Sequence, residues 1–175
     1  MTLVEYRSLS RFALGLGMLI ATPLAAQESA MSQAGPVAEV VAVASTATWL
    51  LRCAVAVPLV PAAGNRGLRQ RLDALAPGRE VHLILDRLRV DVDPGALYRV
   101  ELTGTAKSAP VVAVGSFAVF GVSHREGATA QRSFVVTSAL RQLVDSGGII
   151  VRFVPDVAAA ADARVSVGKI SLVEQ

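Results

Sequence analysis

Two histidines, one cysteine and a pair of aspartates are the main candidates for catalysis or metal binding in this 175-residue chain. They are His82, His124, Cys53, Asp91 and Asp93, and catalysis or metal binding would need several of them in one place. A nucleophilic site needs a serine or cysteine beside a base that a third group orients, and these positions predict no such set. Asp91 and Asp93 precede a Pro-Gly pair, a context typical of turn formers rather than of acid/base groups or calcium ligands. The sequence therefore predicts no catalytic, cofactor-binding or metal site, and a protein that is not an enzyme.

The three ring or thiol side chains differ in their expected surroundings. Cys53 is in phase with apolar neighbours, which favours a small buried hydrophobe over a reactive thiol. His82 is in phase with Ile84 on a predicted strand, which favours a structural role. His124 lies in a polar stretch and could touch a partner or a metal.

The elements that must position these residues are mainly strands. Both alternating faces of Val114–Val122 are apolar, which predicts a central strand covered on both sides. The polar stretch Ser123–Gln131 is expected to be a surface loop. Ser133–Pro155 then predicts a strand, one short helix with Thr137 as its N-cap, and another strand.

Two further elements are expected before this unit. Thr48–Pro58 alternates with its odd positions apolar, which predicts one strand that points Trp49 and Cys53 inward. A short helix follows, capped by Asn65, with leucines at positions 68, 72 and 75 on one face.

Two strands should change their inward phase along their length. Val81–Val90 shifts from Leu85 to Leu88, which indicates a bulge near Asp86-Arg87. The last strand shifts in the same way at Gly168, where we expect a kink. Six or seven short strands with turn signals and two small helices predict a mainly β protein, a single antiparallel β-sandwich.

The N-terminal region has the composition of an export signal. Residues 1–26 combine two arginines, the apolar run Phe12–Ala21 and a small-residue exit, which predicts a signal peptide cleaved after Ala26. The apolar run is about half the roughly 20 residues that span a bilayer, so no stable membrane anchor is expected. We therefore expect a periplasmic or secreted protein with a flexible tether at 27–45 and the sandwich domain at 46–175. A strand at Val37–Val43 is the alternative for part of the tether.

The charge pattern argues against a nucleic-acid partner. The formal net charge is +3, and the basic residues are scattered rather than gathered in a run. A polyanion partner would require such a run.

The order of elements from Leu68 to Glu174 resembles the C-terminal domain of plant polyphenol oxidases and of related bacterial tyrosinase-family proteins. The matching pieces are Gly115-Ser116-Phe117, the Val136-Thr137 start of the short helix, Val151–Pro155 and Val165–Ile170. Tyr98-Arg99-Val100 stands where the family has Phe-Asp-Val.

The resemblance implies a protein that catalyses no reaction itself. In that family the domain packs over a helical domain that holds two copper ions and shields them. A site of that type needs six imidazoles, whereas this chain has two histidines, so oxidase activity is not expected. The resemblance implies a non-catalytic accessory module that docks on a separately encoded tyrosinase-like copper enzyme, with Phe120 and His124 as possible partner contacts. The alternative is a free-standing exported β-sandwich with a structural or unrelated binding role.

Overall fold

Ten strands and two short helices make up the part of the chain that the structure, a computed structural model, describes: residues 38–44, 46–50, 52–62, 67–119 and 129–175. The strands are β1 Glu39–Ala44, β2 Thr48–Leu50, β3 Val55–Pro58, β4 Val60–Pro61, β5 Val81–Val92, β6 Tyr98–Gly104, β7 Val111–Phe117, β8 Ala130–Val135, β9 Ile149–Pro155 and β10 Arg164–Glu174. The helices are α1 Leu68–Asp73 and α2 Thr137–Leu143.

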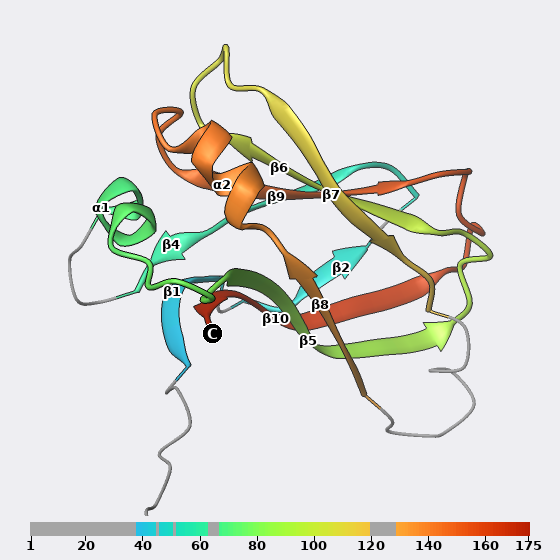
Figure 1. Cartoon of the computed structure of the whole chain (residues 1–175). Helices are drawn as coiled ribbons and strands as arrows, with labels where there is room; N and C mark the ends of the chain where they lie inside the picture. Colours follow the sequence, from blue (N-terminus) through green and yellow to red (C-terminus); the bar gives the residue numbers. More distant parts are fainter. Residues whose placement is uncertain (1–37, 45, 51, 63–66, 120–128) are drawn as a thin grey trace, which may run out of the picture. The chain divides into compact units, whose positions relative to one another are not determined.

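The strands form two antiparallel sheets, seen as two layers in Figure 1. Sheet A has the order β4-β1-β10-β5-β8, with β2 also paired to β10, and sheet B has the order β3-β9-β6-β7. One apolar core lies between them, because buried side chains from both sheets belong to a single cluster. The predicted fold class, a mainly β antiparallel sandwich with two short helices, is confirmed.

β5, the longest strand of the described residues, behaves as its pattern predicts. Leu83 and Leu85 point inward, and the inward phase then moves to Leu88 and Val90. Pairing between β5 and β8 shifts register between Leu85 and Leu88, which is the expected bulge. A register shift of this kind bends the strand and increases its twist.

The strand expected to be central lies at an edge. β7 covers Val111–Phe117 and pairs with β6 on one side only, in an order that ends with β7. Most of its side chains are exposed or half-buried, whereas Phe117 and Val119 are buried. Tyr98, Val100 and Leu102 in β6, flanked by two strands, occupy the central position instead.

The segment expected to be one strand from Thr48 to Pro58 is two strands in different sheets. β2 pairs with β10 in sheet A and β3 pairs with β9 in sheet B. The inward phase changes with the sheet, so Leu50 is buried and Trp49 is 52% exposed. Cys53, between the two strands, is exposed rather than buried. The single-strand interpretation was wrong because the alternation of apolar residues continues where the chain passes from sheet A to sheet B.

The tether expected at 27–45 contains β1 within its last third. β1 lies between β4 and β10, and Val41, Ala42 and Ala44 belong to the core. The alternative of a strand here is therefore correct for Glu39–Ala44.

Thr137 is the first residue of α2 and is not its N-cap. The N-cap is Val136, and no side chain caps the helix. The Thr137 hydroxyl instead accepts a hydrogen bond from the Val81 backbone N–H at 2.8 Å. The side chain thus joins the start of α2 to the start of β5.

Candidate functional site

A row of three side chains crosses the outer face of sheet A. Trp49 in β2 pairs with Ser166 in β10, and Ser166 pairs with Arg89 in β5. Residues directly opposite in antiparallel strands share one face of the sheet, and their neighbours Leu50, Val165 and Val90 fill the core on the other face. The indole, the hydroxyl and the guanidinium therefore lie on one surface.

Arg87 joins this surface through the bulge in β5. Asp86 and Arg87 stand between the inward-facing Leu85 and Leu88, so neither side chain enters the core. Arg87 has a φ of 52°, the only positive φ among non-glycine residues in the described ranges. A left-handed conformation costs such a residue roughly 1–2 kcal/mol, so the surrounding strand pairing holds it in place.

A hollow of about 490 Å³ opens among these side chains. Its lining comes from Ala47, Trp49, Arg87, Arg89, Asp91, Ser166 and Gly168. Gly168 has no side chain to fill the hollow beside Arg87, and a Cβ atom at this position would lie 2.9 Å from the Arg87 Cβ. A second hollow of about 370 Å³, lined in part by Arg164, borders Trp49 and Asp91 as well.

The charges in the larger hollow are only weakly compensated. Arg89 and Asp91 form no side-chain hydrogen bond or ion pair with any residue that the structure describes. The Arg87 Nε lies 3.8 Å from the Asp86 Oδ2, and the Arg87 side chain is 61% exposed. Two guanidinium groups and one carboxylate in the lining are thus available to a ligand.

This set of side chains is suited to recognition. Tryptophan offers a large rigid face with a polar N–H edge, and guanidinium groups donate paired hydrogen bonds to carboxylates. Tryptophan and arginine are also the residues that dominate the energetics of binding surfaces. We take this surface, Trp49, Arg87, Arg89, Asp91 and Ser166, as the candidate site and call it the Trp49 face.

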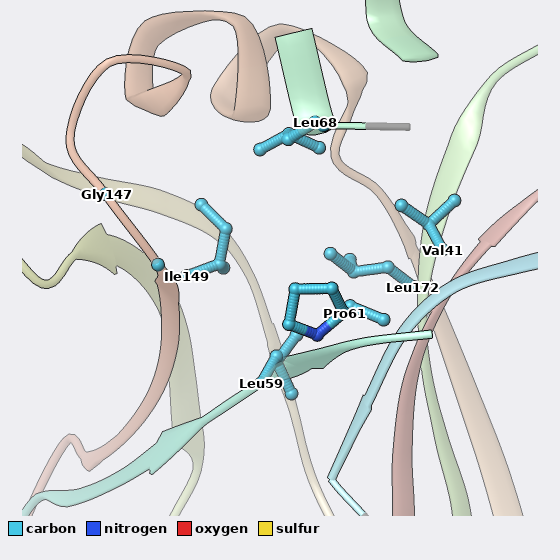
Figure 2. Close-up of a pocket in the computed structure, with 10 residues that line it drawn as sticks. Val41, Leu59, Pro61, Leu68, Gly147, Ile149 and Leu172 are labelled. Atoms are coloured by element: carbon cyan, nitrogen blue, oxygen red, sulfur yellow. The ribbon is translucent and has the colours of Figure 1, made fainter. Parts of the chain in front are cut away.

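An apolar pocket of about 270 Å³ lies elsewhere, between β1, β4, α1 and the start of β9. Figure 2 shows the side chains of Val41, Leu59, Leu68, Ile149 and Leu172 around it. Apolar residues and glycines make up its lining. It offers no side-chain hydrogen bond to orient a ligand, so the Trp49 face is the better candidate.

The residues singled out by chemical type are dispersed. The His82 Nδ1 and the Ser133 Oγ share a hydrogen bond of 3.1 Å across β5 and β8, a structural contact. Asp93 accepts a hydrogen bond from the Gly95 N–H at 2.8 Å, as a turn former does. Phe120 and His124, the possible partner contacts, lie outside the described residues.

Sequence reasoning missed Trp49 and its arginines because it assigned the indole to the core. One signal was present in the chain: the predicted phase change at Asp86-Arg87 marks the bulge that brings Arg87 to the surface. Asp91 was noted, but as a turn former, whereas it lies within β5 on the exposed face.

Comparison of the sequence with protein-family models and with curated proteins gives no match. Across the described residues, no group of three or more histidine, cysteine or acidic side chains is arranged to hold a metal ion. Neither α1 nor α2, the helices of that part of the chain, is long and apolar enough to cross a membrane.

Proposed function

We propose that this chain is a non-catalytic binding module and that the Trp49 face is its binding site. The observation that carries the proposal is the half-exposed indole of Trp49, in one cross-strand row with an unpaired guanidinium, beside a hollow. Burying a large apolar side chain is worth roughly 1.5–3 kcal/mol. A ligand that covers the indole gains part of this free energy, because only 52% of Trp49 is still exposed.

The chemistry of the lining supports binding rather than catalysis. Guanidinium groups stay protonated at any physiological pH and act as hydrogen-bond donors rather than bases. The indole supplies surface and one N–H donor. The hollow is thus equipped to hold a ligand and to orient it.

Trp49 is the only tryptophan of the chain, so its fluorescence reports on this face. The experiment titrates the protein with a panel of four probes: an acidic oligosaccharide, a neutral oligosaccharide, a nucleoside diphosphate and an acidic peptide. At least one class should change the emission saturably, and the variant Arg89→Gln should weaken that response.

Arg141→Gln is the matched control, because Arg141 is exposed in the last turn of α2, a helix that packs against β6, β7 and α1 and contributes no residue to the lining of the hollow. It should bind like the wild type. A panel in which no probe gives a saturable response, or in which Arg89→Gln and Arg141→Gln behave alike, would overturn the proposal.

A second candidate function is supported by the order of elements between Leu68 and Glu174. We propose that an exported module of this type docks on a separately encoded tyrosinase-like copper enzyme and covers its metal cleft. The pieces that carry the resemblance lie in four elements of one sandwich: Gly115–Phe117 in β7, the start of α2, Val151–Pro155 in β9 and Val165–Ile170 in β10.

Co-expression with such an enzyme tests this candidate. Docking predicts that the two proteins co-purify and that oxidase activity falls in the complex. Phe120→Ala and His124→Ala should restore activity while the sandwich stays folded. Failure to co-purify, with unchanged activity of the enzyme, would contradict it.

A further inference from the structure

We infer that the Trp49 face binds an acidic saccharide, with a sugar ring on the indole of Trp49 and its carboxylate on the guanidinium groups of Arg89 and Arg87. This inference rests on the proposed function, since it names the ligand of the same site. Four features of the face carry it: its size, its flat aromatic wall, its mixture of donors and acceptors, and its two exposed guanidinium groups.

The size of the hollow suits one small ligand on an open surface. At about 490 Å³ it falls within the roughly 300–1,000 Å³ typical of small-molecule sites. The neighbouring hollow across Trp49 and Asp91 extends the same surface toward Arg164. A chain of sugars could therefore continue past the indole from one hollow to the other.

The indole supplies the wall that a sugar ring requires. One face of a pyranose carries C–H groups, and these pack against the electron-rich face of an aromatic ring. Trp49 is 52% exposed, while its neighbour Leu50 is 1% exposed, so pairing with β10 fixes the strand and leaves the indole at the surface. A rigid aromatic residue loses little conformational entropy on binding.

The polar groups match hydroxyls, which both donate and accept hydrogen bonds. Arg87 and Arg89 donate, the Asp91 carboxylate accepts, and the Ser166 hydroxyl can do either. Any anionic ligand meets the Asp91 carboxylate as a like charge unless it also brings hydrogen-bond donors. The ring hydroxyls of an acidic sugar can donate to Asp91 while the carboxylate of the sugar lies at the arginines.

The two guanidinium groups select an acidic sugar over a neutral one. Arg89 has no ion-pair partner among the described residues, whereas Arg87 lies 3.8 Å from Asp86, so a neutral sugar leaves the Arg89 guanidinium without a counter-charge. A uronate carboxylate can take a paired hydrogen bond from a guanidinium, the strongest geometry for this contact. The bulge holds Arg87 in its left-handed conformation before any ligand binds, and strained residues of this kind gather at ligand sites.

The test compares tri-galacturonate with the neutral galactose trisaccharide of the same linkage, titrated against the full chain with Trp49 fluorescence as the readout. Tri-galacturonate should bind about tenfold or more tightly, the factor expected for one charge-assisted pair. The preference should shrink as salt is added, because exposed charges are screened. Asp91→Asn should weaken the neutral sugar more than tri-galacturonate, because it removes a hydroxyl acceptor for both sugars and a like charge for the acidic sugar alone.

The arginine variants separate recognition from folding. Arg89→Gln and Arg87→Gln should reduce the preference for the acidic sugar toward one, whereas Arg141→Gln should keep it. Thermal unfolding of each variant checks that the sandwich is intact. Trp49→Ala, which removes both the fluorophore and the aromatic wall, should bind tri-galacturonate more weakly than the wild type when binding is measured by calorimetry.

The outcomes distinguish this inference from the proposed function. Equal binding of the two trisaccharides, or a response to the nucleoside diphosphate or the acidic peptide alone, overturns the inference and leaves the binding module standing. No saturable response to any probe overturns both.

Discussion

Gly168 in β10 lies against Arg87 in β5 so closely that a Cβ atom on the glycine would stand 2.9 Å from the Cβ of the arginine. Both strands change their inward phase at this point, and they do so together. Leu88 stays opposite Val167, and Leu85 stays opposite Ile170, so every one of these side chains remains fully buried. The shared phase change preserves the core, and it places Arg87 and Gly168 in the lining of the hollow beside Trp49.

Substitution of Gly168 should therefore destabilise the sandwich. The Cβ of Gly168→Ala meets an atom next to the Arg87 backbone, which cannot rotate away, so the strands must separate locally. Overpacking of this kind costs about 1–3 kcal/mol. Urea unfolding measures the loss, and Gly67→Ala is the matched control, because nothing lies within 4 Å of a Cβ there.

Arg87→Gly should restore part of the stability that Gly168→Ala loses. Glycine removes the opposing Cβ and adopts the φ of 52° without strain. In that background Gly168→Ala should cost less than it does in the wild type. Additive effects of the two changes would show that the contact does not limit the packing here.

The spacing of apolar residues correctly predicted which side chains face the core within a single strand. The bulge at Asp86-Arg87 and the change of inward phase between Val167 and Ile170 both followed from a shift in the spacing of apolar residues. The strand-helix-strand order of Ser133–Pro155 is likewise confirmed. In each case the signal is local, because the period of side chains along a strand is set by the backbone itself.

Long-range pairing could not be predicted in this way. The alternation from Thr48 to Pro58 continues while the chain passes from sheet A to sheet B, so Trp49 was wrongly placed in the core. The apolar Val114–Val122 was wrongly made central, since an apolar strand can also lie at an edge. The Trp49 face depends on three strands that are far apart in the sequence, and no spacing along the chain indicates that they meet.

The hydroxyl of Thr137 should matter more than its methyl group. It accepts the hydrogen bond of the buried Val81 N–H. Thr137→Val keeps the shape and leaves that donor unpaired, which costs about 1–3 kcal/mol. Thr137→Ser keeps the oxygen and should retain most of the stability in urea unfolding; equal losses for the two variants would contradict this assignment.

Glu101 should stabilise sheet B through two arginines. Its carboxylate lies 2.9 Å from the Arg99 Nε and 3.2 Å from the Arg152 Nη1, and its side chain is only 11% exposed. Glu101→Gln leaves two guanidinium groups beside one amide, so we expect a loss of about 1–3 kcal/mol. Asp162→Asn is the control, because Asp162 is exposed and pairs with no residue of the described ranges. Equal stabilities of Glu101→Gln and Asp162→Asn would argue against a stabilising role for the two ion pairs.

The composition of residues 1–26 leads to a prediction about the mature protein. Export and cleavage after Ala26 should give a periplasmic or secreted chain that starts at Gln27. Intact-mass measurement of the exported protein checks the cut. A membrane-bound product that keeps residues 1–26 would instead identify Phe12–Ala21 as an anchor.

The phenol of Tyr98 should make stability fall in alkaline solution. Tyr98 is fully buried and stacks on Phe117 with ring centroids 5.7 Å apart, and its hydroxyl has no hydrogen-bond partner in the described part of the chain. Burial raises the pKa of Tyr98 above its ordinary value, because desolvation disfavours the phenolate.

The sign of the pH dependence follows from this shift. Below about pH 10 the phenol is protonated in both the folded and the unfolded chain, so it adds no slope. Above that pH the unfolded chain ionises first, and the free energy of unfolding decreases until the folded phenol ionises as well. Tyr98→Phe removes the ionisation together with an unpaired buried hydroxyl, so the variant should match or exceed the wild type at pH 7 and gain on it as the pH rises. Urea unfolding of both proteins between pH 7 and 11 measures the difference, in which every other titrating group cancels; two parallel curves would show that this phenol is accessible to solvent or hydrogen-bonded in the folded protein.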